Sequence, residues 1–208
     1  MKTNLQLVGR SQFTTQLLRT IESHMSKKTI FFLYGPIFTG KSFFAQSFSL
    51  ARSLVPVTYV PDSQSVEQNR DFFAQIENSS LKGIPLGVIV DNFENFLGDV
   101  HRIINKLESL DSCYVFLISR KEERHTLGSL DLSKWSIMEL HFPPLRDRRE
   151  DILPLVESFF YERYNLTPEI DEETKKVLEL YEWPKNIYEI KLLVSELDSA
   201  RVDVDRLP

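Results

Sequence analysis

The residues best suited to chemistry are concentrated in one short stretch, GPIFTGKS at residues 35–42. Its two glycines allow the backbone to turn so that N–H groups point inward, and its lysine and serine supply an ammonium and a hydroxyl. A short apolar run precedes this stretch, and a helical pattern follows it. The spacing G-x-x-x-x-G-K-[ST] in that context is typical of a phosphate-binding loop, the Walker A motif.

We expect this phosphate loop (residues 35–42) to hold the phosphates of ATP or ADP, with coincidence as the alternative. Lys41 would contact the β- and γ-phosphates, and Ser42 would be a ligand of Mg²⁺. The positive end of the helix that begins near Lys41 would add to the attraction. The expected nucleotide-binding residues here are Gly35, Pro36, Ile37, Phe38, Thr39, Gly40, Lys41, Ser42 and Phe43.

A bound Mg²⁺ also calls for a carboxylate at the end of a neighbouring strand. The segment LGVIVDNF places Asp91 directly after a five-residue apolar run. We expect Asp91 to be associated with the metal, and an ordinary turn at the end of a strand is the alternative. Glu94 follows in the same segment, so Asp91 and Glu94 are the candidate catalytic residues.

The elements that must position these residues alternate along the first two thirds of the chain. Short apolar runs predict strands, and apolar residues at helical spacing predict helices between them. Strands that are apolar on both faces are typical of a parallel sheet with helices on both sides, an α/β fold. The expected strands are 29–34, 55–60, 86–90, 113–118 and 137–142, and the expected helices are 11–25, 41–54, 65–79 and 100–110.

The composition and the hydrophobic pattern of the sequence change after Phe142. The segment FPPLRDRRED is a link of prolines and charges, and only helical patterns follow, at 151–164, 171–181 and 184–197. We therefore predict a nucleotide-binding α/β subdomain at 1–146, a helical lid subdomain at 147–200 and a tail at 201–208. The link carries a basic cluster that is either solvated and internally paired, or in contact with nucleotide or a neighbouring subunit. Its members are Arg146, Arg148 and Arg149.

Composition excludes several other classes of protein. The 208 residues are 42% hydrophobic and 26% charged, with a formal net charge of −5, so no strong field attracts nucleic acid or an anionic membrane. The single cysteine, Cys113, rules out an internal disulfide, and the four histidines lack ligand spacing. No apolar run approaches the roughly 18 residues that span a bilayer, and the first ten residues lack a signal peptide's apolar core. These features predict a cytoplasmic protein.

Three further segments point to one family. LVGRS at 7–11, FPPLRDRREDILPLVESFF at 142–160 and YEWPKNIYEIKLLV at 181–194 resemble the AAA+ domain of bacterial sigma-54-dependent transcriptional activators, also called enhancer-binding proteins. With the phosphate loop, the resemblance runs from about residue 5 to 198. It implies a P-loop NTPase of the AAA+ class, with nucleotide held between the α/β subdomain and the lid, and Val8 and Gly9 near the adenine. Members of that family form rings, hydrolyse ATP at subunit interfaces and remodel the polymerase holoenzyme.

This sequence departs from the family at the positions that serve hydrolysis. Asn92 stands where the family has a glutamate that activates water, and an amide cannot accept that proton. Tyr188 takes the place of the lid arginine that reaches the γ-phosphate, and we include it among the nucleotide-binding residues. In the family, the stretch that corresponds to SLDLSKWSIMEL supplies arginines to the nucleotide site of a neighbouring subunit. Here that stretch has no arginine, and its cation is Lys134. The polymerase-contacting loop is absent from the short interval 60–86.

These observations predict a divergent AAA+ protein that binds ATP or ADP with Mg²⁺ and hydrolyses them weakly or not at all. It would serve transcription regulation as a regulatory or assembly module through protein partners, either itself or a related AAA+ protein. We expect no membrane association and no direct binding of nucleic acid. Two alternatives stay open: an active ATPase that uses Glu94, and an interaction module whose phosphate loop is filled or stiffened by Phe38 and Pro36.

Overall fold

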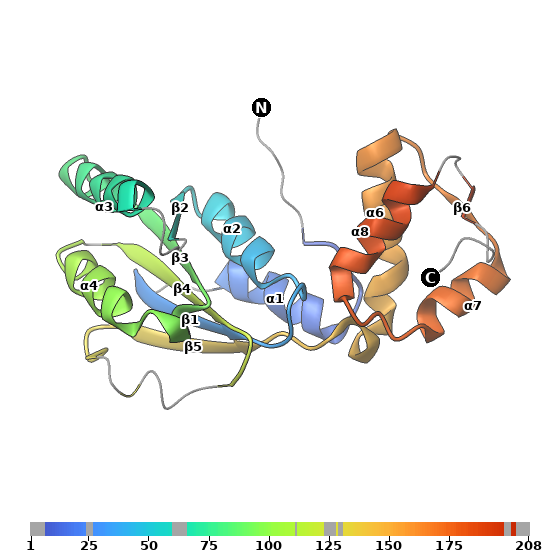
Figure 1. Cartoon of the computed structure of the whole chain (residues 1–208), viewed down its shortest axis with the longest axis horizontal. Coiled ribbons are helices and arrows are strands. Elements are labelled where there is room, and N and C mark those ends of the chain that lie inside the picture. The colour runs from blue at the N-terminus through green and yellow to red at the C-terminus, as the bar shows by residue number, and fades with distance from the viewer. Residues whose placement is uncertain are drawn as a thin grey trace. The chain divides into compact units, whose positions relative to one another are not determined.

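The computed structural model describes residues 7–23, 27–59, 66–110, 112–122, 128, 131–197 and 201–202 (Figure 1). These residues divide into two compact units. The α/β unit contains Ser23–Gly35 and Lys41–Phe142, and the helical unit contains Gln6–Glu22, Pro36–Gly40 and Pro143–Pro208. Because the two units interleave along the chain, they do not test the predicted domain boundaries, which stay a prediction. The two ends of the phosphate loop belong to the α/β unit, and its tip, Pro36–Gly40, belongs to the helical unit.

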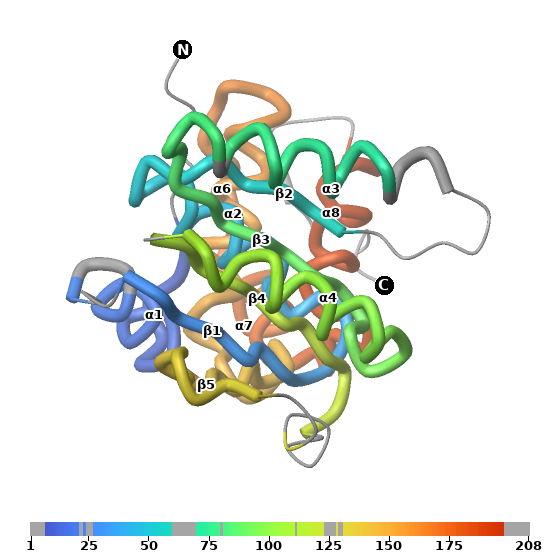
Figure 2. Tube along the Cα trace, turned by 90° about the vertical axis from the view of Figure 1, so that its left-hand side faces the viewer, coloured from blue at the N-terminus to red at the C-terminus, as the bar shows by residue number. Residues whose placement is uncertain are grey.

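The α/β unit is built on a five-stranded parallel sheet, in the order β2-β3-β4-β1-β5 (Figure 2). Parallel strands end at the same edge of a sheet, and the register pairs Tyr34 with Ser119 and Asp91 with Ile118. This edge therefore carries the residues that follow or end β1, β3 and β4. The strands are β1 (Lys28–Tyr34), β2 (Val55–Tyr59), β3 (Leu86–Asp91), β4 (Cys113–Ser119) and β5 (Ser136–His141).

Helices pack on both faces of this sheet, because side chains along each strand alternate between the faces. On one face, Phe31 of β1 packs against Phe48 of α2, with ring centroids 4.8 Å apart. On the other face, Phe32 belongs to the same buried cluster as Phe72 of α3 and Ile103 of α4. The predicted α/β class is confirmed. The helices are α2 (Lys41–Ala51), α3 (Val66–Leu81) and α4 (Leu97–Leu107), and the 3-10 turn η1 (Phe93–Asn95) follows β3.

The helical unit has a separate core, in which Trp183 is 1% exposed and its Nε1 donates to the Leu178 carbonyl at 2.8 Å. Residues Arg201–Val202, which the sequence analysis assigns to the tail, form a short parallel pair with Glu169–Ile170. Among the described residues, no helix is long and apolar enough to cross a membrane. The elements are α1 (Gln12–Ser23), η2 (Leu145–Asp147), η3 (Arg149–Asp151), α6 (Ile152–Tyr164), β6 (Glu169–Ile170), α7 (Glu172–Leu180), α8 (Asn186–Glu196) and β7 (Arg201–Val202).

Candidate functional site

Lys41 is the central cation of the predicted site. It opens α2, is 7% exposed, and its Nζ donates to the Gly35 carbonyl at 2.7 Å. The pKa of Lys41 is lowered to about 8, mainly by burial and also by the charge of Arg120, while Asp91 and Glu94 oppose the shift. Its ammonium is therefore held close to two carboxylates but is only partly compensated by them. An anion at this place would stabilise the charged form.

The predicted metal residues Ser42 and Asp91 lie together. The Ser42 hydroxyl, in the first turn of α2, donates to Asp91 Oδ2 at the end of β3, at 3.5 Å. The Asn92 backbone N–H donates to Asp91 Oδ1 at 2.9 Å and fixes the carboxylate. No group of three or more His, Cys, Asp or Glu side chains in the described ranges could hold a metal ion. A hydroxyl and one carboxylate suit Mg²⁺, which usually keeps several waters and phosphate oxygens as ligands.

The chain turns sharply after Asp91. Asn92 has φ 50° and ψ 41°, a left-handed conformation that asparagine tolerates better than most residues, and it leads into η1. Within η1, Glu94 Oε2 is buried and has no hydrogen-bond partner in the part of the chain that the structure describes. The charge of Glu94 also acts on Lys41. The candidate catalytic residue Glu94 is therefore near the predicted phosphate site.

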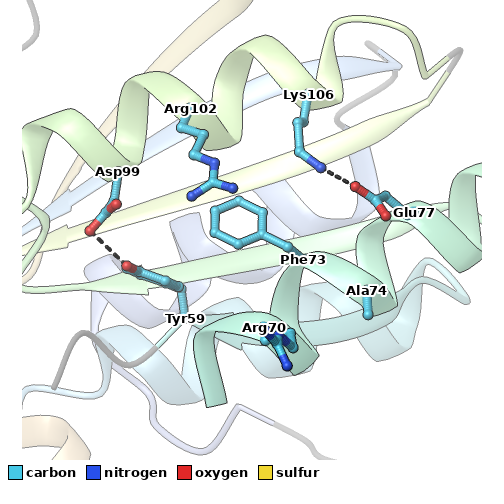
Figure 3. Close-up of a pocket in the computed structure, with 8 residues that line it drawn as sticks. All are labelled: Tyr59, Arg70, Phe73, Ala74, Glu77, Asp99, Arg102 and Lys106. Carbon is cyan, nitrogen blue, oxygen red and sulfur yellow. Dashed lines mark hydrogen bonds and ion pairs between the residues drawn. The ribbon is translucent and has the colours of Figure 1, made fainter. Parts of the chain in front are cut away.

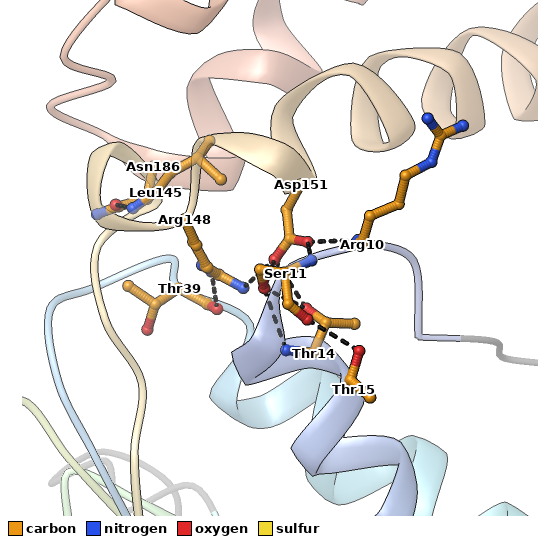
Figure 4. Close-up of polar contacts among 9 residues, drawn as sticks. All are labelled: Arg10, Ser11, Thr14, Thr15, Thr39, Leu145, Arg148, Asp151 and Asn186. Atoms are coloured by element: carbon orange, nitrogen blue, oxygen red, sulfur yellow. Dashed lines mark hydrogen bonds and ion pairs between the residues drawn. The ribbon is translucent and has the colours of Figure 1, made fainter.

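In the helical unit, side chains far away in sequence bind the tip of the phosphate loop. Asn186 Nδ2 donates to the Ile37 carbonyl at 3.0 Å, and Asn186 Oδ1 accepts from the Leu145 N–H at 2.8 Å. Arg148 Nη2 donates to the Thr39 carbonyl at 2.7 Å (Figure 4). The solvated interpretation of the basic cluster is thus wrong for Arg148, which is 6% exposed, because its guanidinium has a buried carbonyl to bind.

An aromatic pair covers the same loop tip. Phe38 has φ 60°, a left-handed conformation that strains a bulky residue. Its ring stacks on Tyr188 of α8, with centroids 4.9 Å apart and planes 25° apart, and its carbonyl accepts from the Ile187 N–H at 3.1 Å. Both rings remain nearly half exposed, at 49% and 42%. Tyr188 therefore contacts a side chain at the loop tip, where the sequence predicts a nucleotide contact.

The segment around Val8 and Gly9, predicted to lie near the adenine, contacts Asp151 in the link that follows Phe142. Val8 packs against the core of the helical unit, and a Cβ on Gly9 would lie 2.3 Å from Asp151 Oδ1. The fully buried Asp151 carboxylate accepts hydrogen bonds from the segment that follows Gly9 (Figure 4). Its donors are Arg10 N at 2.6 Å and Ser11 N, Ser11 Oγ and Thr14 Oγ1, each at 2.7 Å.

Other predicted residues have different surroundings. Phe43 lies on α2 and is 39% exposed, and Pro36 is exposed in the loop tip. Lys134, the cation of the stretch that lacks arginine, is exposed and its Nζ pairs with Glu108 Oε2 at 2.6 Å. Lys134 therefore forms an ion pair with a residue of its own unit.

A surface pocket of about 440 Å³ lies elsewhere on the α/β unit, against α3 and α4 (Figure 3). The guanidinium of Arg102 is 4.2 Å from the centre of the Phe73 ring, and the Tyr59 hydroxyl donates to Asp99 Oδ2 at 2.7 Å. Lys106 pairs with Glu77 at the other end. None of the predicted nucleotide-binding residues lines this pocket.

Comparisons with known proteins agree with this architecture. Residues 146–204 match the family model of the AAA+ ATPase lid domain. Over 84 residues, the chain is 33% identical to the alginate biosynthesis transcriptional regulatory protein AlgB of Pseudomonas putida, covering 36% of this chain and 19% of AlgB. The chain therefore spans less than a fifth of that relative's length.

Solved structures show the same fold over the whole chain. NtrX from Brucella abortus in complex with ATP superposes with a TM-score of 0.72 at 21% identity, covering 100% of this chain and 57% of NtrX. Its ADP complex gives a TM-score of 0.71 at 20% identity, covering 98% of this chain and 55% of NtrX. The chain has the AAA+ fold of P-loop NTPases with an AAA+ lid. The predicted resemblance to the AAA+ domain of sigma-54-dependent activators is confirmed.

Proposed function

We propose that the phosphate loop binds ADP or ATP, and one observation carries this proposal. Within the described part of the chain, the backbone N–H groups of Ile37, Phe38 and Gly40 donate no hydrogen bond. Unpaired N–H groups in a tight loop form a concave anion-binding site. The ammonium of Lys41 adds a full charge. The NtrX structures with ATP and ADP support the choice of nucleotide over other anions.

Mg²⁺ would bind at the Ser42 hydroxyl and the Asp91 carboxylate. The ion would neutralise phosphate charge, and the two side chains would fix its place beside Lys41. The two oxygens lie 3.5 Å apart, so a shared ion would draw them slightly closer, to the spacing of about 3.0 Å that neighbouring ligands have around an octahedral Mg²⁺.

We further propose that the bound nucleotide serves regulation or assembly, with weak or no hydrolysis. The amide of Asn92 cannot take a proton from water. Lys134 is engaged with Glu108, and a lysine lacks the planar fork of an arginine finger, which is worth about 10³ to 10⁵ in rate. The protein would act in the cytoplasm through protein partners, a second copy or a related AAA+ protein, and in transcription regulation, as the name of AlgB suggests.

A second candidate function rests on Glu94. Its buried Oε2 is an acceptor that has no partner within the described ranges, and its charge acts on Lys41. In this alternative Glu94 activates water and the chain is a slow ATPase.

Calorimetric titration with Mg-ADP and Mg-ATP tests the binding proposal. We expect saturable binding to the wild type and at least about a tenfold loss in Lys41→Ala, because charge-assisted hydrogen bonds contribute about 1.5–3 kcal/mol. Lys82→Ala, an exposed lysine in the same unit, is the matched control and should bind like the wild type. No heat with either nucleotide at millimolar concentration would refute the proposal and favour an interaction module that does not bind nucleotide.

A further inference from the structure

Every backbone carbonyl from Gly35 to Thr39 accepts a hydrogen bond. Two of the donors belong to the loop motif itself, and the other three come from distant parts of the sequence. In chain order the donors are Lys41 Nζ at 2.7 Å, Thr39 Oγ1 at 3.0 Å, Asn186 Nδ2 at 3.0 Å, the Ile187 N–H at 3.1 Å and Arg148 Nη2 at 2.7 Å.

Peptide geometry links these carbonyls to the N–H groups of the loop. In a trans peptide the C=O of one residue and the N–H of the next point in opposite directions. A carbonyl that is fixed toward Asn186 therefore turns the N–H of Phe38 away from Asn186. By the same rule, Arg148 at the Thr39 carbonyl turns the N–H of Gly40 away from its guanidinium. These two N–H groups donate no hydrogen bond in the described part of the chain.

We infer that Asn186 and Arg148 are positioning residues that preset the phosphate loop for an anion. This inference rests on the proposed function for the identity of that anion, a nucleotide polyphosphate. Without these donors, the carbonyls of Ile37 and Thr39 could turn inward, where they would repel phosphate oxygens. A loop fixed before binding also loses less conformational freedom when the ligand arrives.

The contact at Thr39 extends to the segment that the resemblance places near the adenine. Arg148 Nη1 lies 3.7 Å from Asp151 Oδ2, and the Arg148 guanidinium is 5.2 Å from the centre of the Phe13 ring. Asp151 in turn binds the N–H groups of Arg10 and Ser11 (Figure 4). Arg148 is therefore held by the Asp151 carboxylate as well as by the Thr39 carbonyl, which fixes its place beside the loop.

The decisive variant is Asn186→Asp. Asn186 has φ 49°, and aspartate tolerates this left-handed conformation. Its carboxylate still accepts from the Leu145 N–H but cannot donate to the Ile37 carbonyl. Asn165→Asp is the matched control, because Asn165 has φ 54°, is exposed, and lies at the end of α6 in the same unit.

The first readout needs no nucleotide. Backbone ¹⁵N relaxation should give order parameters near about 0.85 for Ile37, Phe38 and Gly40 in the wild type and in Asn165→Asp, and values below about 0.6 in Asn186→Asp. The second readout is the Kd for ADP, which we expect to rise about tenfold in Asn186→Asp and to change less than about twofold in Asn165→Asp. If Asn186→Asp does not fold by circular dichroism, Arg148→Lys, which keeps the charge beside Asp151 but not the fork, should loosen Gly40 instead.

Unchanged order parameters in a folded Asn186→Asp would overturn the inference, even if ADP binds to the wild type. If the wild type fails to bind ADP while Asn186→Asp still loosens the loop, the proposed function is wrong and the positioning role stands.

Discussion

The two units of this chain differ in how their candidate acceptor oxygens are paired. In the helical unit, the loop-tip carbonyls and the Asp151 carboxylate all have donors. In the α/β unit, Glu94 Oε2 is buried and has no hydrogen-bond partner among the described residues, and Lys41 has a pKa lowered to about 8. The contrast indicates that the part expected to hold phosphate is built in advance, whereas the part expected to activate water is incomplete. The following substitutions test this contrast.

The largest effect is expected from Asp151→Ala. The substitution removes a fully buried carboxylate with four hydrogen-bond donors and leaves the buried Arg148 without its neighbouring negative charge. Breaking a buried charge pair in this way costs about 3–5 kcal/mol. Urea unfolding followed by circular dichroism should show this loss. Asp147→Ala, at an exposed position of the same link, should leave the midpoint unchanged, and equal effects of the two would contradict the role of Asp151.

The next effect concerns the pH dependence of ADP binding. The pKa of Lys41 is about 8 in the free protein, and bound phosphates should raise it. Binding then takes up a proton above pH 8, so affinity should fall as pH rises from 8 to 9.5, by up to about tenfold per pH unit. The Lys41→Met variant should bind more weakly and lose this dependence. A flat profile in the wild type would show that Lys41 does not meet the phosphates.

A smaller effect is expected from Tyr188→Ala, which removes the ring that covers Phe38. Aromatic pairs contribute about 0.5–1.5 kcal/mol, and this pair is half exposed, so the Kd for ADP should rise only about threefold. Tyr188→Phe keeps the ring and should bind like the wild type. If Tyr188→Phe is as weak as Tyr188→Ala, the hydroxyl contacts the nucleotide and the stacking explanation fails.

The smallest effect is expected from Lys134→Ala. This lysine is exposed and paired with Glu108, and surface ion pairs contribute little to stability. Thermal unfolding and phosphate release should both be unchanged. A clear fall in phosphate release would mean that Lys134 acts on nucleotide bound by a second copy.

The sequence predicts the sheet well because its strands are short and its three central strands, β1, β3 and β4, are buried apolar runs. The expected strand 113–118 differs from β4 by one residue, and the expected strand 55–60 overlaps β2 at Val55–Tyr59, while residue 60 lies outside the described residues. Helix ends are predicted less well. The last helix is expected from residue 184 but begins at Asn186, because Trp183 and Asn186 both have positive φ, at 48° and 49°. Such conformations depend on buried contacts that periodicity does not reveal.

The candidate site also has parts that the sequence predicts and parts that it does not. Local spacing places Lys41 and Ser42 on α2, and the end of an apolar strand places Asp91 beside them. The hydrogen bonds that hold the loop tip are not local, since Arg148 and Asn186 lie 109 and 149 residues from the carbonyls that they bind. The Asp151 contacts with Ser11 and Thr14 span 140 and 137 residues. A single sequence carries no signal for such pairs, although the resemblance draws attention to the segments that contain them.

The most direct test of binding without turnover is steady-state phosphate release at saturating Mg-ATP, measured on the wild type, Lys41→Ala and Glu94→Gln. The account predicts that ATP binds while release stays at the background of Lys41→Ala, and that Glu94→Gln changes nothing. Release of roughly one phosphate per second or faster, lost in both variants, would contradict it and make Glu94 the activator of water.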